Sequence, residues 1–563
     1  MEELKATLLA LGFGYRPGFS DTQIYSEFRV VGLAHLVAVS GAHLALVSTF
    51  LLSLVGRTHL GFRGQSGVLA AFLGLYVLMV GIPVSCLRAA LMALLGLASR
   101  MGGRRSHSLS ALGLVIILFI GFDPACACSL SFQLSVLATL GICLFAPWVS
   151  WWLSKLRCLP RSIVDAVSLT CAATIPTLPV TTVLFSQLPL VAPLSNLVAA
   201  PFLTLVMGIC LLLVPASVCS LVFDLLVASG SVVLAAFVSV VHCLSALPAS
   251  CIPVSSEPLL AYALGVILCV GWWVAWPSPC FRSFRQMASG ALLLVLLLGL
   301  WSYVPALRSG DRLVMLDVGQ GDSFLFESQG KTFLVDTGRY DSRLLAGLAS
   351  EGVNHLDGVL ITHCDDDHYG SLEALLGVVD VDRVFVAKGS GELDNGKALE
   401  IRTMAWRLSG ELPEELAVGS HFGLGSFSFW VVSPKQVDDG GNQDSLVVMA
   451  QVQKGGKEWL ILLTGDAESE TLESVAREGL LCDIDILKVP HHGSRVAVSE
   501  ELLDVIRPEV SLVSVGEGNR YGHPTQEALE MLEGAGSKVY RSDKDGKVVC
   551  NFNDAGLKVA CLG

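Results

Sequence analysis

The sequence predicts a polytopic α-helical membrane domain followed by a soluble α/β domain, and two observations support this prediction. Of the 563 residues, 53% are hydrophobic and only 15% are charged, whereas soluble domains usually carry about 25% charged residues. Residues 1–306 hold 14 Lys/Arg and 8 Asp/Glu, a net charge of +6, while residues 307–563 hold 23 and 42, a net charge of −19. We therefore expect a membrane domain over residues 1–306 and a soluble domain over residues 307–563.

Ten apolar segments of the first domain are candidate membrane spans, because a helix needs about 20 mostly apolar residues to cross the hydrocarbon core. They lie near residues 32–56, 66–84, 85–99, 108–122, 129–149, 163–185, 191–219, 221–246, 258–277 and 287–306. Helix-breaking residues interrupt several of them: Gly41, Pro83, Pro176, Pro179, Pro193 and Pro201. Broken helices are tolerated in a bilayer only where the freed backbone faces protein or water. Each interruption alone is consistent with an ordinary kink, but together they indicate a channel or transporter.

Three polar side chains within the apolar segments, Arg88, Gln133 and Asn196, are the candidate channel residues. A charge at the centre of a membrane helix costs roughly 2.5–3.5 kcal/mol on insertion scales, so it needs a partner or a wet cavity. Arg88 lies in CLRAALMALLG with no acidic residue nearby. It either lines such a cavity or extends its guanidinium towards the membrane interface.

The basic residues predict the orientation of the last span. Arg282 and Arg285 precede the apolar segment 287–306, and a cytoplasmic position for this pair sends residue 307 onward across the membrane. Arg308 and Arg312, just beyond the segment, weaken this inference. The soluble domain is nevertheless expected on the outer side of the membrane.

The soluble domain begins with short alternating strands. Apolar alternation predicts strands at 312–317, 322–328 and 331–336, separated by glycine-containing turns. Helical and strand segments then alternate to the C-terminus, which indicates α/β layers. The four cysteines of this domain show no CxxC spacing, so neither a disulfide framework nor a cysteine-based zinc site is expected.

Three short motifs in this domain carry residues that bind divalent metals. THCDDDH (362–368) follows the apolar strand LDGVLI, TGD (464–466) ends the strand WLILLTG, and PHHGS (490–494) follows a third apolar segment. Imidazole suits zinc and manganese, and carboxylates can bridge two ions. A single histidine here would more often be a solvated loop residue, but a four-donor cluster followed by two further motifs indicates a metal centre.

These motifs, together with LDVGQGDS (316–323) and FLVDTG (333–338), resemble the metallo-β-lactamase fold. More narrowly, they resemble the version fused behind the membrane domain of the ComEC family of competence DNA-uptake channels. The first domain supports this with FRVVGLAHLVAVSGAHL (28–44), CLRAALMALLG (86–96), DPACACSLSFQLSVLATLGI (123–142) and PLSNLVAAP (193–201). The resemblance implies an αββα sandwich of two sheets and a centre of two divalent ions, Zn or Mn.

The resemblance also implies the site residues. The metal ligands are expected at His363, Asp365, Asp367, His368, Asp466 and one or both of His491 and His492, with Asp367 and His523 taking part in catalysis. Asp317 and Asp336 are expected to shape the loops, and substrate contacts are predicted at Asn442, Asp444, Ser445, Lys488 and Ser494, with Arg495 as a further local cation. The stretches 442–445 and 521–524 also fit a turn and a helix N-terminus.

The predicted function is a plasma-membrane channel that imports single-stranded DNA in natural transformation, with a nuclease that degrades the strand left outside. Its partners would be DNA, membrane lipid, a separate DNA receptor and a separate cytoplasmic motor. The motor is expected to be a separate protein because no GxxxxGK[ST] motif is present in this sequence. Self-association is left open. The alternative is a membrane-anchored metallohydrolase that acts on another phosphodiester or an ester. The net charge of −19 argues against a broadly basic DNA surface on the second domain.

Overall fold

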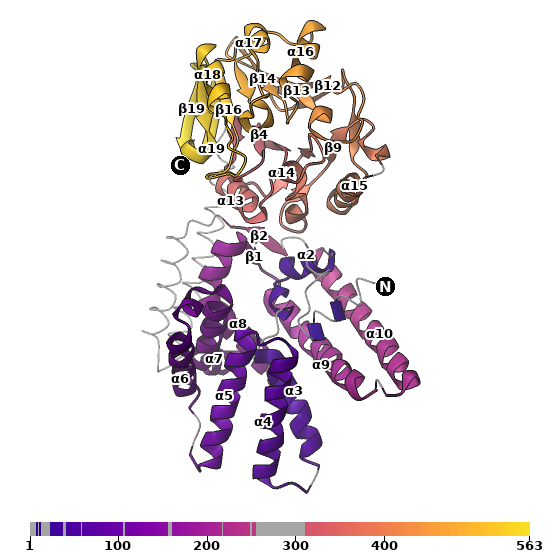
Figure 1. Ribbon diagram of the computed structural model, residues 1–563, viewed down its shortest axis with the longest axis vertical. Helices are drawn as coiled ribbons and strands as arrows, with labels where there is room; N and C mark the ends of the chain where they lie inside the picture. Colours follow the sequence, from indigo (N-terminus) through magenta and orange to yellow (C-terminus); the bar gives the residue numbers. More distant parts are fainter. Residues whose placement is uncertain are drawn as a thin grey trace. The chain divides into compact units, whose positions relative to one another are not determined.

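The computed structural model describes residues 7–8, 11–12, 23–37, 41–57, 59–104, 107–155, 160–216, 218–247, 250–254, 310–393 and 395–562 (Figure 1). The chain forms two units. The predicted spans 258–277 and 287–306, the pair Arg282 and Arg285, and the domain boundary at 306/307 lie outside the described residues.

The first unit is helical. Its described helices are α2 (Gln23–Val30), α3 (Gly41–Val55), α4 (Phe62–Met79), α5 (Val84–Met101), α6 (Ser108–Phe122), α7 (Leu130–Leu153), α8 (Arg161–Phe185), α9 (Ala192–Ala216) and α10 (Ser220–Ser245), and short strands β1 (Gln187–Pro189) and β2 (Cys251–Pro253) pair with each other. Helices α3 to α10 match the first eight predicted segments. Six described helices, α4, α5, α7, α8, α9 and α10, are long and apolar enough to cross a membrane, which confirms the polytopic fold class.

The predicted helix breaks occur only in part. Gly41 begins α3, and Pro83 is the N-cap of α5, as expected for residues that interrupt helices. Pro176 and Pro179, however, lie inside α8, which continues through both, and Pro201 lies inside α9. The helices are therefore not broken at these three prolines. At Pro176 the freed backbone is covered by α7, because a Cβ on Gly141 would lie 2.2 Å from the Ala172 carbonyl oxygen.

The second unit is a sandwich of two mixed sheets. The first sheet has the order β10-β9-β7-β5-β4-β3-β18-β19, and the second has the order β11-β12-β13-β14-β15-β16-β17. The first contains β3 (Asp311–Met315), β4 (Phe324–Ser328), β5 (Lys331–Val335), β7 (Gly358–Leu360), β9 (Val384–Ala387), β10 (Glu414–Leu416), β18 (Lys547–Asn553) and β19 (Gly556–Leu562). The second contains β11 (His421–Leu424), β12 (Phe427–Ser433), β13 (Val447–Lys454), β14 (Lys457–Leu463), β15 (Ile486–Lys488), β16 (Val510–Val513) and β17 (Lys538–Arg541). The three strands predicted between residues 312 and 336 are β3, β4 and β5.

Aromatic side chains from both sheets form the core between them. Phe326 of the first sheet makes edge-to-face contacts with Phe427 and Phe429 of the second, with ring centroids 5.2 and 5.1 Å apart. A second apolar cluster lies between the other face of the second sheet and the helices α16 (Ser469–Arg477), α17 (Glu500–Ile506) and α18 (Gln526–Gly534). The remaining helices are α13 (Asp341–Glu351), α14 (Asp366–Tyr369), α15 (Gly396–Ser409) and α19 (Ser542–Asp545). The predicted αββα sandwich is confirmed (Figure 1).

Parallel pairing within the sandwich gathers the ends of several strands. β5, β7 and β9 run parallel in the first sheet, and β14, β15, β16 and β17 run parallel in the second. The carboxyl ends of parallel strands lie at one edge of a sheet. The loops after β7, β14 and β15, which carry the three sequence motifs, therefore reach a common edge.

Candidate metal centre

The loop between β7 and α14 is anchored by a buried aspartate at the end of β5. Asp336 accepts hydrogen bonds from the backbone N–H and the hydroxyl of Thr362, both at 2.8 Å. Its Oδ2 atom also lies 2.8 Å from Nδ1 of His368. Asp336 thus fixes both the start of the loop and the ring of His368, which is the loop-shaping role expected for it.

Three buried imidazoles are oriented through their Nδ1 atoms. His492 donates from Nδ1 to the Ser514 carbonyl oxygen at 2.9 Å, and Nδ1 of His363 lies 3.2 Å from the hydroxyl of Ser445. Together with the Asp336–His368 contact, these bonds leave every Nε2 atom facing inward. The three Nε2 atoms are buried and have no hydrogen-bond partner within the described ranges 310–393 and 395–562, which is the arrangement of metal-ligating histidines held by outer hydrogen bonds.

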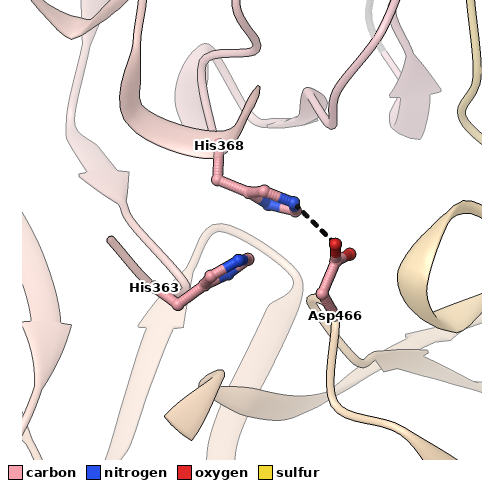
Figure 2. A group of neighbouring side chains, drawn as sticks. All are labelled: His363, His368 and Asp466. Carbon is pink, nitrogen blue, oxygen red and sulfur yellow. Dashed lines mark ion pairs between the residues drawn. The ribbon is translucent and has the colours of Figure 1, made fainter. Parts of the chain in front are cut away.

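Two carboxylates complete the donor set. Asp466 Oδ2 lies 3.3 Å from Nε2 of His368 (Figure 2). The same oxygen lies 3.5 Å from Nε2 of His492. Asp367 Oδ2 lies 3.3 Å from Nε2 of His492. Two groups of donors, His363 with His368 and Asp466, and Asp367 with His368 and His492, have ligand atoms within 4.8 Å of one another. Nitrogen and carboxylate donors at this spacing fit a divalent ion such as Zn or Mn.

The electrostatics of the pocket favour positive charge. Burial lowers the pKa of His492, but Asp466 and Asp322 outweigh it and raise the pKa to about 10. Burial likewise opposes ionisation of Asp466, yet His492, His368 and Lys488 hold the pKa of Asp466 well below its usual range. A divalent ion takes the place of such imidazolium protons when it binds, so the residues present fit a metal centre.

Two further charged residues lie beneath this centre. Asp322, in the LDVGQGDS motif, is 1% exposed and pairs with the ammonium of Lys488. Lys488 also lies 3.3 Å from Asp466 Oδ1 and donates to the Gly465 carbonyl oxygen at 2.5 Å. The LDVGQGDS motif alone did not indicate a role for Asp322, and Lys488 was predicted to contact the substrate. Because Lys488 is only 2% exposed and already paired, it offers no free ammonium to a substrate phosphate.

Two predicted ligands lie at the margin of the donor set. Asp365 is half exposed, 3.6 Å from Nε2 of His363, and it also pairs with Lys397 at 3.1 Å. The contact with His363 lowers the pKa of Asp365 to about 2 against the opposing effect of burial. His491 turns away from the centre, with Nδ1 3.4 Å from a Glu468 oxygen.

The two adjacent histidines diverge because both have left-handed backbone angles, φ 43° at His491 and 54° at His492. Of the pair, only His492 points into the donor groups. The structure thus favours His492 over His491 as a ligand, a choice that the sequence left open.

Two of the predicted substrate contacts, Asp444 and Ser445, are buried and bond within the fold of the site. Asp444 Oδ2 accepts three backbone N–H bonds, from Asp438, Asp439 and Gly440, so it shapes its own loop. Ser445 is fully buried between His363 and the N–H of Asp466. Both therefore act in folding the site, contrary to the predicted contact with substrate.

The other predicted residues lie within or around the PHHGS motif. The Asn442 amide is 3.4 Å from Nε2 of His491, and the buried Ser494 hydroxyl has no partner in the part of the unit that the structure describes. His523 is half-buried with its ring centroid 5.8 Å from that of His491. Arg495, predicted as a local cation, forms an ion pair with Glu527, with 2.8 Å between Nε of Arg495 and Oε2 of Glu527.

In the membrane unit, the predicted channel residues are internally bonded. Arg88 is 5% exposed and donates from Nε to the Ser135 hydroxyl at 2.9 Å, which joins α5 to α7. Gln133 donates to the Ala127 carbonyl oxygen and Asn196 to that of Ala192, at 3.0 and 2.8 Å. The guanidinium of Arg88 is thus held inside the unit and does not extend to the interface.

Fold and donor set together define a class: a multi-pass membrane protein with a metallo-β-lactamase-fold unit of the metal-dependent hydrolase type. Residues 316–425 match the Metallo-beta-lactamase superfamily, and residues 11–279 match the Competence protein family. The chain thus combines a competence-type membrane unit with a metallo-β-lactamase-superfamily unit, the combination that its motifs predicted.

Relatives match both units over nearly the whole chain. ComE operon protein 3 of Bacillus subtilis (strain 168) is 29% identical over 95% of this chain and 70% of its own length. Competence protein ComA of Neisseria gonorrhoeae is 28% identical over 97% of this chain and 74% of its own length. Among solved structures, the metallo-beta-lactamase GOB-18 from Elizabethkingia meningoseptica is similar at 16% identity and a TM-score of 0.26, covering 40% of this chain and 87% of its own.

Proposed function

We propose that the protein imports single-stranded DNA across the plasma membrane during natural transformation and that its hydrolase unit cuts the strand that is not imported. The match to the Competence protein family supports the uptake role. The observation that carries the hydrolase role is the set of three buried Nε2 atoms, on His363, His368 and His492, gathered around Asp466.

Two divalent ions, Zn or Mn, are proposed for this centre. His363 and Asp466 would hold one, and Asp367, His368 and His492 would hold the other. When bound, such ions activate water and neutralise charge on a phosphodiester.

The residues of the chain supply orientation and proton transfer. Asp336 and the Ser514 carbonyl fix two of the imidazole rings, and Lys488 balances the buried charge of Asp322 and Asp466. Burial and the neighbouring His491 lower the pKa of His523, which keeps its ring neutral near pH 7. A neutral imidazole beside the centre can accept or return a proton at the reacting oxygen.

The hydrolase unit is proposed to face outward, because the discarded strand must be cut before or during entry. Capture of DNA and the driving force for its import are assigned to separate receptor and motor proteins. The membrane lipid surrounds the helical unit, whose membrane-length helices are the path of the imported strand.

Arg88 is proposed to act in that path. Its guanidinium joins α5 to α7, and a Cβ on Gly41 at the start of α3 would lie 3.8 Å from it, so three helices meet at this cation. Arg88→Ala is expected to reduce uptake of labelled DNA while leaving hydrolysis unchanged. Normal uptake by Arg88→Ala would remove Arg88 from the proposed path.

The hydrolase proposal is tested with the purified full chain and end-labelled DNA in the presence of Mn or Zn. Cleavage that depends on the metal and disappears in Asp367→Ala is expected. The negative net charge of the second unit favours a second candidate function, a membrane-anchored hydrolase of other phosphodiesters or esters. Hydrolysis of a small ester or diester without any cleavage of DNA would favour that candidate.

A further inference from the structure

An exposed group of tyrosines and arginines lies beside the metal centre. Tyr340 is 48% exposed and Tyr521 is 50% exposed, although large hydrophobic side chains in this unit are mostly buried. Arg343 and Arg520 accompany them. We refer to Tyr340, Arg343, Arg520 and Tyr521 as the tyrosine–arginine surface.

Tyr340 and Arg343 lie at the start of α13, and Arg520 and Tyr521 lie in the loop after β16; the LDVGQGDS loop contacts both of these segments. A Cβ on Gly319 would lie 3.2 Å from both the Tyr340 ring and the Arg343 guanidinium. On the other side of the same loop, a Cβ on Gly516 would lie 2.8 Å from the backbone nitrogen of Gln320. Gly516 begins the segment that carries Arg520 and Tyr521, so the segments that carry the two parts of the surface both contact one glycine-rich loop.

A series of rings leads from this surface to the metal centre. The Tyr521 ring is nearly parallel to that of His523, at 10° and 6.0 Å between centroids, and the Arg520 guanidinium lies 5.3 Å from the Tyr521 ring. His523 is 5.8 Å from His491, which is 6.4 Å from His492. Tyr521 is therefore three ring-to-ring steps from His492, a proposed metal ligand.

The surface also carries available positive charge in an acidic unit. Arg520 has no carboxylate partner among residues 310–393 and 395–562, and it bonds only to the Tyr521 hydroxyl there, at 3.3 Å. Arg343 is partly neutralised by Asp317 at 3.1 Å. Of the two arginines of the tyrosine–arginine surface, Arg520 is thus the one whose charge is free to meet a phosphate.

We propose that the tyrosine–arginine surface binds unpaired bases of single-stranded DNA, with one base stacked on Tyr521 and the adjoining phosphate on Arg520. Aromatic rings bind bases of any sequence through their faces, and arginine adds a contact to the backbone. Such binding needs few cations, which reconciles a DNA substrate with a net charge of −19. The inference rests on the proposed nuclease function, and it specifies that the strand reaching the metal centre is unpaired.

Photochemical crosslinking tests the binding without requiring catalysis. The full chain in detergent, with EDTA present, is irradiated with an oligonucleotide that contains 5-iododeoxyuridine, and the modified peptides are identified by mass spectrometry. A crosslink at Tyr521 is expected, with none at Trp406, an exposed aromatic residue on α15 that serves as the internal control. Absence of a crosslink at Tyr521 would overturn the proposal.

Kinetics with Mn and single-stranded oligonucleotides test the contribution of stacking. Tyr521→Ala is expected to raise KM about tenfold with little change in kcat, whereas Tyr521→Phe and the control Trp406→Ala keep the wild-type KM. An oligonucleotide with an abasic site near the cut should raise KM for the wild type but not further for Tyr521→Ala. Equal effects of the abasic site on both proteins would refute base stacking.

The two assays separate this inference from the proposed function. A chain that crosslinks through Tyr521 and cleaves no DNA would refute the nuclease and retain the binding surface. A chain that cleaves DNA, shows no crosslink at Tyr521 and has the same KM in Tyr521→Ala would retain the nuclease and refute the surface.

Discussion

Replacing Lys488 by Met tests whether the buried Lys488–Asp322 pair balances the charge of the metal centre. Asp322 is 1% exposed, and after the substitution its nearest cationic neighbour would be Nδ1 of His492, at 3.4 Å. Removing one partner of a buried ion pair typically costs about 3–5 kcal/mol, because an uncompensated charge remains. That is a large share of the roughly 5–15 kcal/mol that stabilises an ordinary domain.

The measurement is urea unfolding of residues 307–563 in EDTA, which keeps metal binding out of the comparison. With a slope near 3 kcal/mol per M, the Lys488→Met midpoint is expected about 1–2 M below that of the wild type. The double variant Asp322→Asn with Lys488→Met should recover at least half of the loss, because the neutral amide no longer needs the ammonium. Losses that simply add in the double variant would refute the pairing.

The pH dependence gives the same test a second readout. Burial alone would raise the pKa of Asp322, but Lys488 and then His492 hold it below its ordinary value. The stability from this pair is therefore present above the unfolded pKa of about 3.9 and is lost as pH falls below it. The difference between wild type and Lys488→Met should therefore stay nearly constant from pH 7 to about 4 and shrink as the pH falls below about 4.

Three further predictions concern other parts of the second unit. Asp367→Ala should abolish metal-dependent hydrolysis by isolated residues 307–563 while leaving their far-UV circular dichroism unchanged; retained hydrolysis would remove Asp367 from the site. Burial opposes the ionisation of Asp311, but hydrogen bonds from Lys454 and Ser328 outweigh it and lower the pKa of Asp311. The wild type therefore loses the stability from this carboxylate as the pH drops below about 4, and the free energy of unfolding of Asp311→Asn should fall less over that range. The third prediction uses a cysteine introduced at exposed Glu392 in a protein whose exposed native cysteines are changed to serine. This cysteine should react with a membrane-impermeant maleimide in cells whose outer barrier is permeabilised. Protection from the reagent would place the hydrolase unit in the cytoplasm.

Periodicity and motif position predicted much of the second unit. The alternation of apolar residues located β3, β4 and β5, because each strand has a face in the core between the sheets. The motifs at strand ends placed His363, His368, Asp466 and the pair His491 and His492 near one another, since parallel strands bring their loops to one edge. The preference for His492 over His491 came only from the structure, because it depends on the left-handed backbone angles of the pair.

The charges beneath the metal centre could not be predicted in this way. Asp322 and Lys488 are 166 positions apart in the chain, and each is locally unremarkable, one after a glycine turn and one at the end of a strand. Their pairing depends on how the two sheets face each other, which no local pattern specifies. The continuation of α8 through Pro176 could not be predicted from local sequence either, because it depends on the close approach of Gly141 in α7.

The metal donors come from both layers of the sandwich, and this has a consequence for the lifetime of the protein. His363 and His368 follow a strand of the first sheet, while Asp466 and His492 follow strands of the second. An ion held by both sets acts as a clamp across the layers, and at a free concentration 1,000 times its dissociation constant it adds about 4 kcal/mol to the folded state. A shortage of that metal would then remove hydrolase activity and also lower the stability of the unit. Because the unfolded unit is open to proteases, the supply of metal would also control the amount of protein in the cell.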